Sequence, residues 1–134
     1  MMKHQLALEW IPGRFAVCRL DVHDAVPAWA HGDMPLVSIT RTAGELSIVA
    51  AEEAVPESAK AERGWAAMRI GGTLDFSLVG ILSKLTGALA EANVPVFVIS
   101  TYDTDVLLVR ADDAARAERA LSPTASFAPR QRPL

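Results

Sequence analysis

Residues 65–110 read WAAMRIGGTLDFSLVGILSKLTGALAEANVPVFVISTYDTDVLLVR, and this stretch decides the fold. It begins with a strand pattern from Trp65 to Ile70, which Gly71 and Gly72 end. A helical pattern, a second strand, a tight turn and a third strand follow. That order is most of a ferredoxin-like βαββαβ module. Polar residues occur where the helix begins and in the hairpin beside it, which suits binding of a small zwitterion rather than chemistry on it.

The helix of this unit is predicted from Phe76 to Ala92, where apolar residues recur at spacings of three and four. Asp75 or Ser77 can cap its start, and Asn93 can end it in the left-handed conformation. Downstream, strands are predicted at residues 96–101 and 106–109 and a second helix at residues 112–121. The chain after Leu121 is predicted to be loop.

The first half of the chain reads as strands with only short helical pieces. Pro12 and Gly13 predict a turn between its first two strands, and Gly44 predicts a tight hairpin between the next two. Residues 21–32 read as a loop with one helical turn at most, and Pro56 suits the first turn of a short helix within residues 52–63. The four strands are expected at residues 5–10, 15–20, 35–40 and 46–50.

An internal repeat relates the two halves. Phe15-Ala-Val-Cys-Arg-Leu20 matches Trp65-Ala-Ala-Met-Arg-Ile70 at an offset of 50 residues, and the hairpin segment 39–49 matches 99–109 at an offset of 60. The second copy has room for a full helix where the first has a shortened connection. We therefore expect two related units, residues 1–62 and 63–134.

Composition limits the class of protein. The chain has 134 residues, 51% of them hydrophobic and 22% charged, which predicts a folded globular protein. A net charge of −3 and scattered basic residues argue against a nucleic-acid partner. Cys18 is the lone cysteine, and neither a signal peptide nor a membrane-spanning segment is expected. A cytoplasmic protein is the expectation.

The motifs resemble a known family. Leu74-Asp75-Phe76-Ser77-Leu78-Val79-Gly80 and Ile99-Ser100-Thr101-Tyr102-Asp103-Thr104-Asp105 look like the second unit of small tandem ACT-domain proteins, similar to the aspartate kinase regulatory region and the cytosolic arginine sensor. The resemblance covers roughly residues 10–121. It implies an α+β fold of two ferredoxin-like units packed side by side, the first with a shortened helix. It also implies amino-acid binding between units, often across a dimer.

Two segments of the second unit are the candidate binding site. Free N–H groups at a helix start bind a carboxylate without a basic side chain; the residues there are Asp75, Phe76, Ser77, Leu78 and Gly80. An ammonium group needs acceptors, which strand carbonyls or the hairpin residues Ser100, Thr101, Asp103 and Asp105 could supply. The resemblance implies that Asp105 stands where the arginine sensor holds its ligand's side-chain cation. Tyr102 and Asp103 depart from that sensor, so the ligand's identity does not carry over.

Each candidate has a structural competitor. Asp75 suits a helix cap equally well, Asp103 with Thr104 suits a plain hairpin turn, and Asp105 suits a solvated carboxylate beside that turn. The loop with His23 and His31 holds metal-ligand residue types but no recognised spacing. No catalytic motif, cofactor or metal is predicted.

We expect a non-catalytic sensor of an amino acid or similar zwitterion that acts as a homodimer. The competing hypothesis is a structural dimerisation module with a vestigial site, and a small enzyme using the histidine loop is the third. The second unit lacks a strand after its last helix. We expect the N-terminal strand Leu6 to Trp10 to cover that sheet edge.

Overall fold

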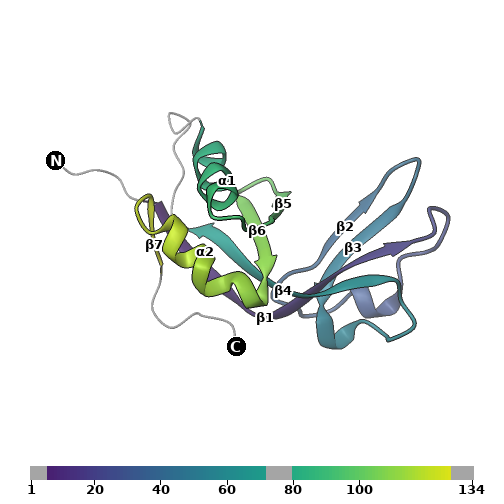
Figure 1. Ribbon diagram of the computed structural model, residues 1–134. Helices are drawn as coiled ribbons and strands as arrows, with labels where there is room; N and C mark the ends of the chain where they lie inside the picture. The colour runs from purple at the N-terminus through teal and green to yellow at the C-terminus, as the bar shows by residue number, and fades with distance from the viewer. Residues whose placement is uncertain (1–5, 72–79, 128–134) are drawn as a thin grey trace.

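The computed structural model describes residues 6–71 and 80–127, and in them a single mixed sheet carries two α-helices (Figure 1). The strands are β1 (Leu6–Leu20), β2 (Ser38–Arg41), β3 (Leu46–Ala51), β4 (Ala61–Gly71), β5 (Phe97–Ser100), β6 (Asp105–Arg110) and β7 (Ala125–Phe127). The helices are α1 (Ile81–Glu91) and α2 (Ala114–Leu121), with short 3₁₀ turns η1 (Ala28–Ala30), η2 (Glu52–Ala54) and η3 (Ala111–Asp113). The two halves thus share one sheet and do not form two separate ones.

The sheet order is β2-β3-β1-β4-β6-β5, with every neighbouring pair in this path antiparallel. The start of β1 pairs with the end of β4, from Ala7 with Gly71 to Ile11 with Ala67. The end of β1 pairs with β3 on its other side. β1 therefore pairs with strands of both halves. The predicted cover of the second unit's edge by the N-terminal strand is confirmed.

β1 is one strand where the sequence predicted two. Pro12 and Gly13 form an irregularity within it, because the five residues from Ile11 to Phe15 lie opposite only three on β4, from Ala67 to Trp65. Gly13 has φ +95°, a conformation that favours glycine. Such a bulge bends a strand without ending it. The predicted turn is therefore wrong, and the bend lets one strand serve both halves.

Other boundaries differ more modestly. Only η2 forms in the predicted helical region 52–63, and β7, which pairs in parallel with the start of β1, replaces the predicted loop after Leu121. The helix predicted from Phe76 begins only at Ile81, because Gly80 has φ +88°, which a right-handed helix does not allow; residues 72–79 lie outside the described residues. Asn93 ends α1 with φ +62°, as predicted.

The sheet has a covered face and an open face. Leu8, Trp10 and Met68 lie on the covered face and pack beneath α1 and α2 with Leu85 and Leu89 of α1. In the first half, the loop around η1 covers the sheet in place of a helix, packing Ala30 with Cys18 and Ile48. The alternate residues face the other way and form a third cluster that includes Ile11, Phe15, Val49, Trp65, Val106 and Leu108. No helix of the described segments covers this open face.

The hairpins correct the register of the repeat. Thr42 N–H donates to the Glu45 carbonyl, and Thr101 N–H donates likewise to the Thr104 carbonyl. In both turns the threonine Oγ1 accepts the N–H of that same partner residue. The offset between the hairpins is therefore 59 and the predicted 60 is wrong, while the offset of 50 between β1 and β4 agrees with their pairing to β3 and β6.

Candidate functional site

A cavity of about 350 Å³ lies between the two outer strands β2 and β5. Consecutive residues of each strand line it, so backbone groups from both unpaired strand edges contribute to its wall. Hydroxyl and apolar side chains supply the rest, and none of its lining residues is charged: Leu36, Val37, Ser38, Ile39, Thr40, Ser47, Val49, Phe97, Val98, Ile99, Ser100 and Thr101. We call this space the edge cavity. Its wall offers donors and acceptors without fixed charge.

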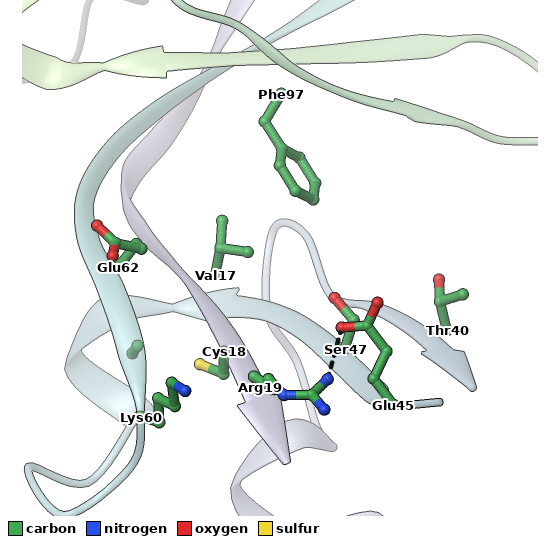
Figure 2. A pocket seen from close by; sticks show the side chains of 10 residues that line it. Val17, Cys18, Arg19, Thr40, Glu45, Ser47, Lys60, Glu62 and Phe97 are labelled. Carbon is green, nitrogen blue, oxygen red and sulfur yellow. Dashed lines mark hydrogen bonds and ion pairs between the residues drawn. The ribbon is translucent and has the colours of Figure 1, made fainter. Parts of the chain in front are cut away.

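A second space of about 430 Å³ lies beside it, and we call it the charged pocket (Figure 2). Phe97 points into it from β5, while Arg19 and Lys60 lie at the opposite end (Figure 2). Its full lining is Val17, Cys18, Arg19, Thr40, Glu45, Ser47, Lys60, Ala61, Glu62 and Phe97. Because Thr40, Ser47 and Phe97 line both spaces, the edge cavity and the charged pocket are adjoining compartments of one groove on the open face.

Ion pairs occupy part of the charged pocket. Arg19 donates to a Glu45 carboxylate oxygen and to the Gly44 carbonyl, each at 3.2 Å. Glu62 contacts Arg110 only at 3.5 Å, and its side chain is 72% exposed. Cys18 lies in the wall but is buried, and burial raises the pKa of its thiol above the ordinary 9.0, against a smaller lowering by Arg63. The thiol is therefore held in its neutral form.

The open face also holds an unusual tryptophan. The ring of Trp65 lies 6.3 Å from that of Phe97, and the Arg110 guanidinium stacks over it at 4.8 Å. Its indole N–H is buried and has no hydrogen-bond partner among the described residues. Trp65 is thus a fluorescent side chain in contact range of a groove residue.

The structure brings some of the predicted site residues to the groove. Ser100 and Thr101 line the edge cavity, and the Ser100 hydroxyl donates to Asp105 Oδ1 at 2.6 Å. Neither Asp103, which is exposed in the turn, nor Asp105 lines the edge cavity or the charged pocket. Gly80 immediately precedes α1 with φ +88°. Asp75, Phe76, Ser77 and Leu78 lie outside the described residues.

Local hydrogen bonds shape the hairpin that carries these residues. Thr101 Oγ1 donates to the Thr104 carbonyl at 3.0 Å and accepts from the Thr104 N–H at 3.1 Å. Thr104 Oγ1 donates to the Ile70 carbonyl at 2.8 Å, which ties the turn to the end of β4. The turn residues therefore have a structural role whatever they bind.

Sequence reasoning missed the groove residues of the first half. Thr40, Ser47 and Arg19 stand in predicted strands at alternate, open-face positions, and Phe97 lies in a predicted strand of the second half. The polar residues at alternate positions were a usable signal. Nothing in the sequence indicates that Thr40 and Phe97 line the same groove, because the two residues are distant in sequence and their strands are at opposite edges of the sheet.

Residues 6–71 and 80–127 contain neither a metal-binding cluster nor a helix suited to span a membrane. No three His, Cys, Asp or Glu side chains there could jointly hold a metal ion, and His23 and His31 are both exposed. No helix of these segments has the length and apolar character that a membrane crossing requires.

A family model for the ACT domain matches residues 60–123. The chain belongs to the ACT-domain family. A second model, described as the N-terminal domain of another family, matches residues 13–58 of this ACT-domain protein. No curated protein matches the sequence.

Solved structures resemble this ACT-domain protein over nearly its whole length. A protein from Agobacterium tumefaciens is 33% identical, with a TM-score of 0.88 and 94% of each chain covered. A Vibrio cholerae protein of unknown function, described as a possible transport protein, is 19% identical, with a TM-score of 0.75 and 91% of each chain covered. The regulatory subunit of aspartate kinase from Thermus thermophilus is 12% identical, with a TM-score of 0.59, 85% of this chain covered and 94% of that subunit. The last two show the likeness of fold alone.

Proposed function

We propose that this ACT-domain protein is a non-catalytic regulatory protein that binds an amino acid or similar small zwitterion in the edge cavity. The observation that carries the proposal is an uncharged cavity between two unpaired strand edges, with Ser100 and Thr101 in its wall. Strand N–H groups can donate to a carboxylate, and carbonyl or hydroxyl oxygens can accept from an ammonium. A zwitterion is neutral overall, so a wall without charged side chains suits it.

The remaining predicted residues belong to the same proposal. Asp105 is held by Ser100, and its second carboxylate oxygen could accept from a ligand cation. We also assign Asp75, Phe76, Ser77, Leu78 and Gly80 to the side of the site that binds the ligand's carboxylate, and Asp103 to its hairpin side.

The mechanism we propose is a population shift in the angle between the halves. β2 with β3 and β5 with β6 diverge like the arms of a V in Figure 1, and the edge cavity lies between the outer strands. A ligand held by both strands favours the arrangement in which they are closest, by no more than its differential affinity for the two states. The protein would act in the cytoplasm as a homodimer.

The unit division also stands as part of this proposal. Residues 1–62 and 63–134 would form two ferredoxin-like units joined by the pairing of the central strands β1 and β4. Support comes from the shared hairpin hydrogen bonds and from the family models, which meet between residues 58 and 60.

Thermal-shift screening with the twenty amino acids tests the proposal. A ligand at one hundred times its dissociation constant should stabilise the fold by about 2.7 kcal/mol. Thr101→Val and Ser100→Ala should weaken that shift, whereas Tyr102→Ala, fully exposed in the same hairpin, should leave it unchanged. The proposal fails if none of the twenty raises the melting temperature.

One observation favours the alternative of a structural dimerisation module with a vestigial site. Ile39 is 41% exposed on β2, whose outer edge has no partner strand among the described residues, and such an edge can pair with another chain. A dimer that Ile39→Lys dissociates, together with no response to any amino acid, would favour this function over sensing.

A further inference from the structure

The charged pocket carries an inference of its own, and Lys60 is its centre. Arg19 N–H donates to the Lys60 carbonyl at 3.0 Å, and the adjacent residues Cys18 and Ala61 are paired. Arg19 and Lys60 are therefore direct cross-strand neighbours on the open face. Like charges in this position destabilise a sheet unless negative charge lies nearby.

Among the described residues, only Arg19 of these two cations forms an ion pair. Glu45 forms an ion pair with Arg19, as the dashed line in Figure 2 marks. No ion pair or side-chain hydrogen bond to the Lys60 ammonium occurs among the described residues. Glu62, two residues further along the chain in β4, is bound weakly to Arg110 instead. Within residues 6–71 and 80–127, Lys60 thus has no direct ion pair and lies beside Arg19, which is paired with Glu45, while the Glu62 carboxylate lines the same pocket.

Apolar side chains lie between this charge and the edge cavity. Val17 and Phe97 line the charged pocket, and Phe97 also lines the edge cavity. Each compartment alone is near the lower end of the roughly 300–1,000 Å³ range of small-molecule sites. A ligand that fills both needs an apolar stem past Phe97 and an anionic end at Lys60.

We propose that the charged pocket is a subsite for a carboxylate at the far end of the ligand, bound by Lys60 with Arg19 beside it. This inference rests on the proposed function, because the ligand's zwitterionic group would occupy the edge cavity. The ligand class is then an amino acid with an acidic side chain or a short peptide with a free C-terminus. Lys60 binds the carboxylate at the far end of the ligand, and Phe97 contacts the apolar part of the ligand between its two charged ends.

Matched ligand pairs isolate the far charge. Isothermal titration calorimetry would compare L-glutamate with L-glutamine, and glycyl-L-alanine with its C-terminal amide. We expect the carboxylate member of at least one pair to bind about threefold to tenfold more tightly, the range for a charged hydrogen bond discounted for exposure. The glutamate pair and the dipeptide pair distinguish the two sources of the carboxylate.

Matched variants assign that preference to Lys60. Lys60→Gln should abolish the preference, and Lys60→Arg should retain it. Lys84→Gln makes the same charge change at an exposed position on α1, so it should have no effect. Trp65 fluorescence gives a second readout at the groove, because the Trp65 ring is next to Phe97.

The outcomes separate this inference from the proposed function. Equal binding of both members of each pair, or a preference that survives Lys60→Gln, overturns the subsite and leaves zwitterion binding intact. Failure of every amino acid and dipeptide to bind the wild-type chain removes the proposed function and the subsite together.

Discussion

Leu8→Ala should destabilise the whole molecule, although Leu8 lies far from the helices in sequence. Leu8 is completely buried and belongs to the cluster beneath α1 and α2. The substitution removes three carbon groups, about 2.4 kcal/mol of transfer free energy at 0.8 kcal/mol each. A cavity term adds to this, so we expect a loss of about 3–4 kcal/mol in the free energy of unfolding.

Urea denaturation followed by tryptophan fluorescence and by far-UV circular dichroism measures this loss. With a slope of about 2 kcal/mol per molar urea, the midpoint should fall by roughly 1.5–2 M. Both probes should give one coincident transition, because β1 pairs with strands of both halves. Ile39→Ala, on an exposed position of β2, is the matched control and should change stability by less than about 1 kcal/mol.

Two results would refute this reasoning. A loss below 1 kcal/mol for Leu8→Ala would mean that the N-terminal strand is not integral to the helical layer. Two separate transitions, with only one moved by the substitution, would mean that the halves fold independently.

Three further predictions concern single residues. Gly80→Ala should cost about 1 kcal/mol, because φ there is +88°, whereas Gly87→Ala, within α1 with open space around it, should stabilise by about 0.5–1 kcal/mol; chemical denaturation of both variants compares them. Thr104→Val should lose about 1 kcal/mol with its hydrogen bond to the Ile70 carbonyl, and an unchanged melting curve would contradict this. Burial raises the pKa of Cys18, so the folded thiol stays protonated at pH values where the unfolded thiol, with its ordinary pKa of 9.0, ionises. The contribution of Cys18 to the free energy of unfolding should therefore be full below pH 9.0 and decline as the pH rises above it. Urea titrations between pH 8 and pH 10 should show this decline in the wild type and not in Cys18→Ala.

Periodic patterns predicted the regular elements well. The three- and four-residue spacing around Leu85 and Leu89 predicted the core of α1, and two-residue alternation predicted the strands on either side of the hairpins. These patterns express the burial of one face, which the local sequence encodes directly.

Features set by distant pairing could not be read in the same way. Pro12 and Gly13 have the same local preference in a turn and in a bulge, and only pairing with β4 decides between them. β7 is three residues long and forms against the start of β1, more than 100 residues away. Residue identities favour an offset of 60 between the hairpins, whereas the equivalent hydrogen bonds of Thr42 and Thr101 give an offset of 59.

The candidate site shows the same limit. Ser100 and Thr101 were predicted from the hairpin motif, and the structure places them in the edge cavity. The opposite wall comes from β2, and the order of the strands across the sheet brings the two together. No local pattern around Thr40 or Lys60 indicates which residues of the second half they face.

The strand shared between the halves has a consequence for synthesis on the ribosome. Leu8 and Trp10 emerge early, yet the residues that cover them include Leu107 and Leu121 near the other end of the chain. At a translation rate of about 5–20 residues per second, these apolar side chains are exposed for roughly 5–20 s before the residues that bury them are synthesised. The segment around Leu8 and Trp10 therefore needs protection during synthesis, and a chain truncated before Leu107 would leave it uncovered.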